Sequence, residues 1–338
     1  MKMKTVVKPL TLTRDVLKSG EKMTLAPIAM KTQKHLSFTC DIDKLGGGKV
    51  LIGHGKDESS ASWVEVTADE IGVYAYYTYT DPMKRNLLKE ECKHGFDVFG
   101  TLSVVIDVNP LNKGCTVLVS CASGAVKLQP TGWDGTYGEI FVEAEGVDLK
   151  NCKLNWSSDG FARKIWILGD SYSGFGHAAR WPFYLYRDGY NNNMISGYPG
   201  MSSEAAIEEF RRFVDYGSPE FVVWTLGMNN SDKDGKVNEG YLKSVEEFIK
   251  ICEERGITPI LSTIPNVPER DNSPKNEWVR KSSYRYIDFN RAVGADKDVH
   301  WYPEMLSADN VHPAAKGAEA LYMQVLCDFP EIMQKTGV

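Results

Sequence analysis

The chain has 338 residues, of which 42% are hydrophobic and 25% charged, so it can bury ordinary cores and is not a disordered chain. Its net charge of −6, without a long basic block, argues against a nucleic-acid partner and against binding to anionic membrane surfaces. No run approaches the ~20 apolar residues that span a bilayer, and the N-terminus lacks the apolar stretch of a signal peptide. The sequence therefore predicts no nucleic-acid and no membrane partner, and it leaves the oligomeric state open.

The cysteines bear on the compartment of the protein. They number seven, an odd count, and none shows zinc-binding spacing. We interpret them as small hydrophobic residues in a reducing compartment and predict no metal site. A complete chain would then be cytoplasmic, whereas a chain whose secretory peptide has been removed would be periplasmic or secreted.

Short runs with alternating apolar and polar residues dominate the sequence before residue 160. Clusters rich in Gly, Asp, Asn and Pro separate these runs, and no helical pattern lies between them. Many short strands at this spacing are typical of an antiparallel β-sandwich, and we expect a jelly-roll-like version as an accessory domain over residues 1–158. The predicted strands are 37–42, 49–55, 62–68, 72–80, 101–108, 115–121 and 139–146.

After residue 160 the pattern changes to strands that alternate with helices, which predicts a three-layer α/β/α domain with a mostly parallel sheet over residues 159–338. The predicted strands are 164–169, 192–197, 221–227, 258–264 and 285–289. The predicted helices are 179–189, interrupted at Pro182, then 202–217, 237–256 and 312–329. Ligand chemistry in such sheets takes place at the carboxyl ends of the strands, so the residues there are the candidates for a site.

The first two strand ends carry a serine and a glycine. Ser171, in Gly-Asp-Ser, directly follows a buried strand and can point its hydroxyl toward the carboxyl edge of the sheet. Alone this triplet is a weak signal, because most such triplets are turns that cap the next helix. Gly200 follows the second strand and can present its backbone N–H to a ligand, although Pro199-Gly200 taken alone is equally a simple turn.

The third strand end and the last predicted helix carry the remaining polar groups. Asn229 can direct its amide N–H toward the same edge, or it can simply begin a loop. Asp309 and His312 are three residues apart, so the carboxylate can reach the imidazole ring and set its tautomer. We expect Pro313 to occupy the first position of the last helix and to hold His312 at its rim. The simpler alternative is an Asp that caps a helix beside an exposed His.

The four features together are more specific than any one of them. Ser171 to Gly200 and Gly200 to Asn229 are each 29 residues apart, which is one strand-helix-strand step of a parallel sheet. The three residues would therefore lie at neighbouring strand ends. With Asp309 and His312 they supply the nucleophile, base, orienting carboxylate and oxyanion donors that an acyl-transfer site requires.

This order of motifs resembles the SGNH (GDSL-like) hydrolase superfamily, from about residue 164 to the C-terminal helix. The matching motifs are Gly169-Asp170-Ser171, Gly200, Gly227-Met228-Asn229-Asn230 and Asp309-Asn310-Val311-His312-Pro313. The resemblance implies a flavodoxin-like fold, with Ser171 as nucleophile, His312 as base and Asp309 as its partner. It also implies oxyanion donors at Ser171, Gly200 and Asn229. Two positions depart from the family pattern: Asn230 stands where Asp is frequent, and Tyr172 replaces an aliphatic residue.

We therefore predict a serine esterase that hydrolyses short-chain, acetyl-type esters, with a glycan ester as the expected substrate and no metal or organic cofactor. The β-rich first half resembles the accessory domains of glycan-processing esterases and favours the carbohydrate. Candidate substrate-binding residues near the strand ends are His177, Arg180, Trp181 and Trp301, although each is singly more common as a surface or packing residue. The alternatives are acyl transfer to a sugar hydroxyl, a lipase or thioesterase of the same superfamily, and a non-catalytic glycan-binding protein.

Overall fold

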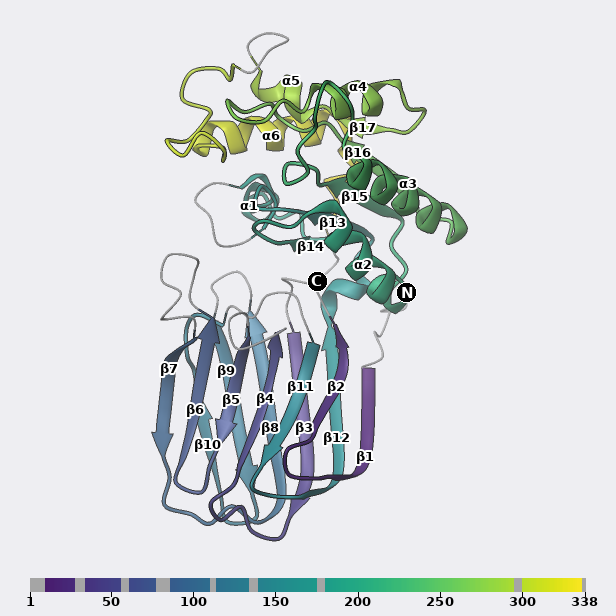
Figure 1. Cartoon of the computed structure of the whole chain (residues 1–338). Coiled ribbons are helices and arrows are strands. Elements are labelled where there is room, and N and C mark those ends of the chain that lie inside the picture. Colours follow the sequence, from purple (N-terminus) through teal and green to yellow (C-terminus); the bar gives the residue numbers. More distant parts are fainter. Residues whose placement is uncertain are drawn as a thin grey trace. The chain divides into compact units, whose positions relative to one another are not determined.

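The chain divides into two compact units, Met1–Asp159 and Gly160–Val338 (Figure 1). The structure, a computed structural model, describes residues 10–27, 34–55, 61–76, 86–109, 114–133, 139–174, 180–294 and 300–335. The first unit consists of antiparallel sheets and the second of helices around a parallel sheet, as the change of pattern near residue 160 predicts.

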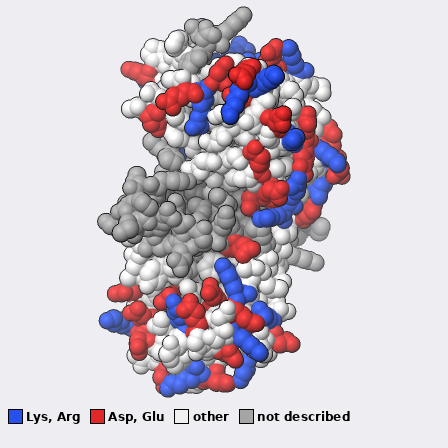
Figure 2. All heavy atoms as spheres, viewed as in Figure 1, with Lys and Arg blue, Asp and Glu red and all other residues white. Residues whose placement is uncertain are grey.

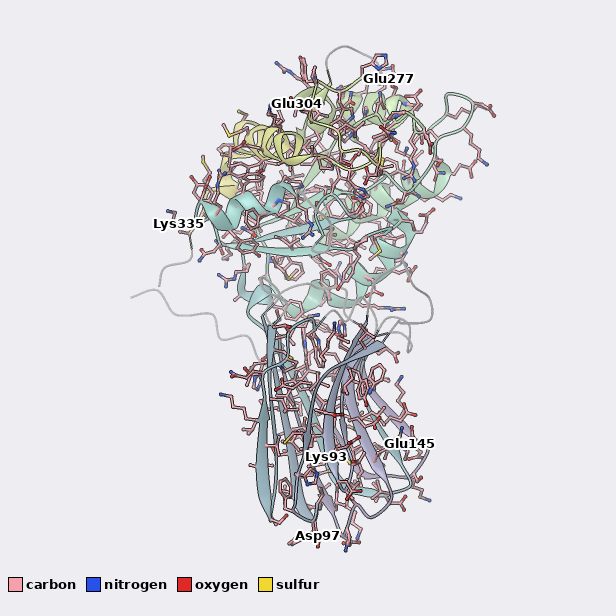
Figure 3. All side chains as sticks on the ribbon, turned by 90° about the vertical axis from the view of Figure 1, so that its left-hand side faces the viewer. Lys93, Asp97, Glu145, Glu277, Glu304 and Lys335 are labelled. Atoms are coloured by element: carbon pink, nitrogen blue, oxygen red, sulfur yellow. The ribbon has the colours of Figure 1, made fainter. Side chains whose placement is uncertain are left out.

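Two six-stranded antiparallel sheets, placed face to face, build the first unit (Figures 1 and 3). Residues alternate between buried and exposed along strands such as Lys34–Ile42, because successive side chains of a strand point to opposite faces. One sheet has the order β1 (Leu10–Leu17), β12 (Leu149–Ser158), β3 (Lys34–Ile42), β8 (Gly100–Asn109), β9 (Gly114–Cys121) and β10 (Gly124–Leu128). The other has the order β2 (Lys22–Pro27), β11 (Glu139–Glu145), β4 (Lys49–Gly55), β5 (Ser62–Val66), β6 (Glu70–Tyr76) and β7 (Asn86–Lys93).

Alternation predicted seven strands of this unit, and five further strands of the described residues were not predicted. Four of these five are the edge strands of the two sheets. These are β1 and β10 in one sheet and β2 and β7 in the other, with β12 as the fifth. Edge strands pair on one side only and tend to carry charged residues that discourage further pairing. The edge strand β7, with the sequence NLLKEECK, is an example. Such strands have a weak apolar alternation, which is why the pattern did not reveal them.

A five-stranded parallel sheet forms the centre of the second unit. Its order is β14 (Asn193–Gly197), β13 (Ile165–Gly169), β15 (Phe221–Thr225), β16 (Thr258–Ser262) and β17 (Tyr286–Ile287). This is the order 2-1-3-4-5 of flavodoxin-like sheets. All residues of β13 and β14 are buried, which explains the continuous apolar sequence of β13.

Two groups of helices cover this sheet, on opposite sides of it (Figure 1). One group pairs α2 (Ser203–Phe213) with α3 (Glu239–Glu254), and the other packs α1 (Trp181–Arg187) and α5 (Phe289–Val293) on α6 (Ala315–Asp328). Helix α4 (Ser273–Lys281) follows β16. Short 3-10 turns occupy Asp159–Ala162, Val214–Tyr216 and Pro330–Ile332.

Two helix predictions are wrong, and two helices of the structure were not predicted. Pro182 does not interrupt a helix; it lies in the first turn of α1, where its missing N–H has no intrahelical partner to lose. Pro313 is not the first residue of the last helix, since α6 begins two residues later at Ala315. Helices α4 and α5 were not predicted, because α4 has nine residues and α5 has five, too few for a clear period.

The surface view in Figure 2 shows positive and negative side chains interspersed on the visible face, in line with a net charge of −6. In the part of the chain that the structure describes, no helix has both the length and the apolar character needed to cross a membrane. Within the same residues, no group of three His, Cys, Asp or Glu side chains is arranged to hold a metal ion.

Candidate active site

The carboxyl ends of β14, β13 and β15, three neighbouring strands of the parallel sheet, lie level with one another. Gly169, the last residue of β13, pairs with Gly197 on β14 and with Thr225 on β15. The loops that carry Ser171, Gly200 and Asn229 therefore begin at the same edge. The N–H of Tyr198 donates to the carbonyl of Gly169 at 3.1 Å and ties the second loop to the first.

His312 lies between Ser171 and Asp309. Its Nε2 is 2.8 Å from the Oγ of Ser171, and its Nδ1 is 2.8 Å from Oδ2 of Asp309. With the ring proton on Nδ1, the imidazole donates to the carboxylate and accepts at Nε2 from the serine hydroxyl. The structure thus brings together the three residues that the sequence predicts as nucleophile, base and orienting carboxylate.

Asp309 makes four hydrogen bonds and is the centre of its loop. Its Oδ1 accepts from the Ser307 hydroxyl at 2.7 Å and from the backbone N–H groups of Val311 and His312, each at 2.9 Å. Partial burial acts to raise the pKa of Asp309, but these donors and the His312 ring outweigh it and hold the pKa well below its usual range. The carboxylate therefore stays ionised at neutral pH.

The loop before α6, rather than the helix itself, holds His312. The carbonyl of His312 accepts from the N–H of Ser307 at 2.9 Å, and Leu306 forms an isolated bridge with Pro313. Asn310 turns the chain with φ of 57°, a conformation that Asn tolerates better than most residues. The Asp-x-x-His-Pro pattern predicted His312 at the first turn of the last helix, whereas the structure has it in this closed loop before α6.

Tyr172 connects the nucleophile turn to this loop. Its hydroxyl donates to the carbonyl of Val311 at 2.5 Å, and its ring lies 6.1 Å from the ring of His312. Burial, and then the nearby carboxylates of Asp170 and Asp309, raise the pKa of Tyr172 well above its usual value, so the hydroxyl keeps its proton. The aromatic departure from the family pattern therefore has a specific contact, which an aliphatic side chain could not make.

The loops at this edge of the sheet carry three N–H groups that are candidate oxyanion donors. Within the described ranges, the backbone N–H groups of Ser171 and Gly200 donate to no other protein group. Gly200 has φ of 76°, which favours glycine, and it is exposed. The side-chain amide of Asn229 donates one N–H to the carbonyl of Met201 at 3.0 Å, which leaves its second N–H for another acceptor.

Asn230 braces the loop that carries Asn229. Its Oδ1 accepts from the N–H of Ser203 at 3.0 Å and from the Ser203 hydroxyl at 2.8 Å, and its Nδ2 donates to Glu204 at 2.7 Å. Ser203 and Glu204 form the first turn of α2. The amide is buried and uses both its acceptor and its donor, so Asn rather than Asp suits the carboxylate beside it.

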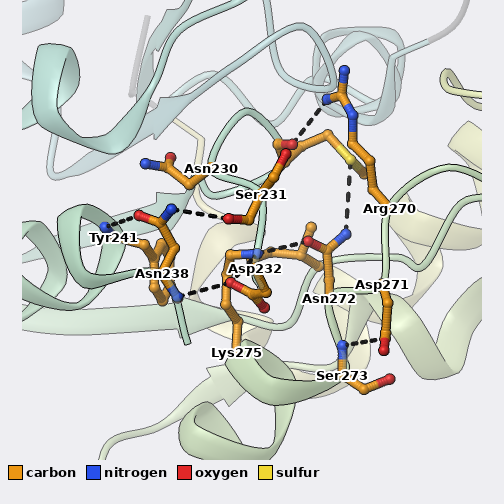
Figure 4. A network of polar contacts seen from close by, with 12 residues as sticks. Asn230, Ser231, Asp232, Asn238, Tyr241, Arg270, Asp271, Asn272, Ser273 and Lys275 are labelled. Atoms are coloured by element: carbon orange, nitrogen blue, oxygen red, sulfur yellow. Dashed lines mark hydrogen bonds and ion pairs between the residues drawn. The ribbon is translucent and has the colours of Figure 1, made fainter. Parts of the chain in front are cut away.

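The loop after β16 supplies a further residue that the motif analysis missed. Nη1 of Arg270 donates to the carbonyl of Met228 at 2.9 Å and lies 3.4 Å from Oδ1 of Asn229 (Figure 4). The positive guanidinium thereby fixes the orientation of the Asn229 amide. Applying the strand-end rule to the fourth strand as well as to the first three would have pointed to this loop.

A buried ion pair lies next to Arg270 in the same network (Figure 4). Nζ of Lys275, fully buried on α4, is 2.8 Å from Oδ1 of Asp232 and 2.8 Å from Oδ1 of Asn272. Asp232 also accepts from the N–H of Asn238, the N-cap of α3. The pair joins α4 to the loop after β15, three residues beyond Asn229.

The other predicted substrate-binding residues have different positions. His177 lies outside the described residues. Trp181 was predicted as a substrate-binding residue, but its side chain is fully buried and its Nε1–H donates to the hydroxyl of Ser173 at 3.2 Å. It therefore cannot stack on a sugar. Trp301 is partly buried, with its Nε1–H donating to the carbonyl of Asn266 at 2.6 Å. Arg180 is the partly buried N-cap residue of α1.

Solved structures similar to this chain cover about half of it. A GDSL-like lipase from Bacteroides thetaiotaomicron has 15% identity and a TM-score of 0.40, over 49% of this chain and 87% of that one. A lipase/acylhydrolase from Enterococcus faecalis has 23% identity and a TM-score of 0.40, over 52% and 100%. A carbohydrate esterase family 3 protein from Talaromyces cellulolyticus has 16% identity and a TM-score of 0.40, over 52% and 100%.

The sequence itself matches no protein-family model and no curated protein. Over about half of its length, and at low sequence identity, the chain is similar in structure to GDSL-type acylhydrolases and lipases.

Proposed function

We propose that this protein is a serine ester hydrolase that cleaves short-chain, acetyl-type esters of a carbohydrate through an acyl-enzyme. The observation that supports it best is the position of the His312 ring, 2.8 Å from the Ser171 hydroxyl and 2.8 Å from the Asp309 carboxylate. Such a chain of hydrogen bonds lets the imidazole accept the serine proton while the carboxylate stabilises the imidazolium that forms.

In the first step, the Ser171 oxygen attacks the ester carbonyl carbon as its proton passes to Nε2 of His312. The carbonyl oxygen becomes an oxyanion, for which the N–H groups of Ser171, Gly200 and Asn229 are the nearby donors. The tetrahedral intermediate collapses, the His312 proton goes to the leaving alkoxide, and an alcohol departs. Ser171 is left acylated.

In the second step, His312 removes a proton from water, which attacks the acyl carbonyl. Collapse of the second intermediate returns the proton to the Ser171 oxygen and releases the carboxylic acid. Asp309 keeps its charge throughout, in agreement with the low pKa that its four hydrogen bonds impose.

The carbohydrate part of the proposal rests on the organisation of the chain. All the groups named in the two steps belong to Gly160–Val338, and the unit Met1–Asp159 contributes none of them. Hydrolysis of a small free ester requires no second folded unit. A separate β-sheet unit of this size is more consistent with an extended substrate, for which a polysaccharide is the simplest choice.

A pair of serine variants tests the nucleophile. Ser171→Ala should abolish both hydrolysis of 4-nitrophenyl acetate and covalent labelling by a fluorophosphonate, mapped by mass spectrometry. Ser173→Ala is the matched control, because the Ser173 hydroxyl lies in the same turn but is 2.8 Å from that of Thr225. Full activity of the Ser171 variant, or labelling at another residue, would contradict the proposal.

Asn229→Ala should lower kcat by roughly 100-fold with a smaller change in KM, since an oxyanion donor acts in the transition state.

Acetate release from acetylated xylan tests whether the substrate is a carbohydrate ester. Release from acyl thioesters alone would favour a thioesterase, and acylated sugar formed from added acceptor would favour acyl transfer.

A further inference from the structure

A pocket of about 330 Å³ lies on the outer face of the sheet that contains β4, β5 and β11. Its lining includes the aromatic residues Trp63 and Phe141 and the charged residues Lys22, Lys49, Glu65 and Glu143. All belong to the first unit and none is used by the proposed reaction. The volume is within the range of small-ligand pockets.

Gly53 opens a gap between the two aromatic side chains. On β4, Gly53 pairs with Trp63 of β5 on one side and with Phe141 of β11 on the other. The two aromatic residues therefore lie two strands apart, a distance of about 10 Å. A Cβ at Gly53 would lie 2.4 Å from the carbonyl oxygen of Ser62 and 2.6 Å from Cβ of Trp63, so no other residue fits there.

Trp63 lines the pocket and has one ring face covered by a neighbouring aromatic side chain. This face is stacked on Tyr74, the neighbour on β6, with ring centroids 5.2 Å apart and an angle of 18°. Because Gly53 is the neighbour of Trp63 on the other side, the opposite ring face is the one turned toward Gly53. Phe141 is different, because Nζ of Lys22 lies over its ring, 4.5 Å from the centroid.

Charged groups of both signs surround this gap. Nζ of Lys49 is 3.5 Å from Glu65 and 3.2 Å from Glu145, which projects at the surface of the unit in Figure 3. Glu143 is partly buried beside them and has no ion-pair partner among the described residues. The pocket thus offers carboxylate acceptors and ammonium donors next to an aromatic face, with little net charge.

We propose that this pocket is a saccharide-binding site that receives a pyranose ring against the face of Trp63 opposite Tyr74. A pyranose has an apolar C–H face that can pack on an indole, and hydroxyl groups that need both acceptors and donors. Lys22 and Lys49 disfavour a cationic ligand, and the carboxylates disfavour an anionic one. An aliphatic ligand would desolvate these charges without replacing their hydrogen bonds. All residues that line the pocket belong to the first unit, whereas Ser171 belongs to the second, and the proposal does not depend on the proposed esterase activity.

Isothermal titration calorimetry of the full chain with unacetylated cellohexaose, xylohexaose and mannohexaose tests this site. We expect saturable one-to-one binding of at least one of them. Trp63→Ala should weaken that binding at least tenfold, and Glu143→Gln about fivefold. Phe99→Ala is the matched control, because Phe99 is 43% exposed in the same unit and does not line the pocket, and it should leave the affinity unchanged.

Two further measurements keep the result unambiguous. Protein blocked at Ser171 by a fluorophosphonate should bind the saccharide with the same affinity, which separates this pocket from the active site. If Trp63→Ala does not unfold cooperatively and is therefore not properly folded, the affinity of the isosteric Glu143→Gln variant tests the site instead. Absence of binding by all three saccharides, or equal affinity of the Glu143 variant and the wild type, would overturn the proposal.

Discussion

At the scale of single residues, Tyr172 and Asp170 distinguish this site from a simple Ser-His-Asp arrangement. Tyr172 is a buried aromatic residue whose hydroxyl reaches across to the carbonyl of Val311 at 2.5 Å. Asp170, buried beside Ser171, accepts from the N–H of Tyr172 at 3.0 Å. Tyr172 thus connects the turn of Ser171 to the loop of His312, and Asp170 accepts a hydrogen bond within that turn.

Tyr172→Phe should lower kcat for an aryl ester by about tenfold, because the loop that carries His312 loses a hydrogen bond of about 1–2 kcal/mol to a partly buried carbonyl. KM should change little, since the tyrosine only positions the base. The control is Tyr284→Phe, whose hydroxyl donates to Glu253 at an exposed position. Equal kcat values for Tyr172→Phe and the wild type would show that the contact is dispensable.

Asp170 has a predictable effect on the pH dependence of stability. Burial raises the pKa of Asp170 to about 6, above the value of an unfolded Asp. Between about pH 4 and pH 6 the folded state therefore binds more protons than the unfolded state, and the free energy of unfolding falls as the pH rises. Asp170→Asn removes this cost and should raise that free energy by about 1–3 kcal/mol at pH 7.5, with little change at pH 4.

Denaturant unfolding at the two pH values measures this difference. Asp234→Asn, in an exposed turn, serves as the control and should show the same stability as the wild type at both. An Asp170 variant that is destabilised to the same extent at pH 4 and pH 7.5 would rule out the titration as the cause.

At the scale of elements, the loop after β15 is held by contacts with two helices that lie elsewhere in the sequence of the second unit, α2 before it and α4 after β16. Asn230, in the loop after β15, joins the first turn of α2, and Lys275 of α4 joins the same loop through Asp232. These contacts explain why the two oxyanion candidates Gly200 and Asn229 have fixed positions although they lie in loops. The rigid parallel sheet sets where the loops begin, and the side-chain contacts set where they end.

Asn230→Asp restores the residue that is frequent in the resembling family, yet we expect it to destabilise this chain by about 1–3 kcal/mol. The new carboxylate would face that of Glu204, which now accepts from the Asn230 amide at 2.7 Å, and like charges at this distance repel. Adding Glu204→Gln should recover most of the loss. Denaturant unfolding of both single variants and the double variant checks the coupling, and strictly additive effects would contradict it.

At the scale of the whole molecule, the two units have separate cores. Leu36 is fully buried in the first and Ile260 in the second, and the two sheets of the first unit share no strand with the parallel sheet of the second. Units of this size with their own cores can unfold independently.

Differential scanning calorimetry should therefore resolve two transitions in the full chain. Leu36→Ala should lower only one Tm and Ile260→Ala only the other, since each substitution leaves a cavity that costs about 2–5 kcal/mol in its own core. This corresponds to a shift of several degrees for units of this length. A single transition, lowered equally by both substitutions, would show that the units unfold together.

The sequence by itself determined the elements with strong periodicity and the residues at their ends. Short strand-like runs that alternate with helical patterns predicted β13 to β17, and period-two alternation predicted seven strands of the first unit. The two patterns differ because a strand is buried on two faces in the one case and on one face in the other. Ser171, Gly200, Asn229, Asp309 and His312 could be named because the carboxyl ends of parallel strands meet at one edge.

Only the tertiary structure decided which of these side chains meet and which are buried. The contacts of Tyr172, Asn230 and Arg270 join positions 26 to 139 residues apart, so no local pattern contains them. Tryptophan is a residue type that can stack on sugars, but Trp181 is buried because α1 packs on its neighbours. The pocket beside Trp63 likewise depends on the register that places Gly53 between two aromatic residues. Local sequence sets the period of an element, whereas register and packing between distant segments set its contacts.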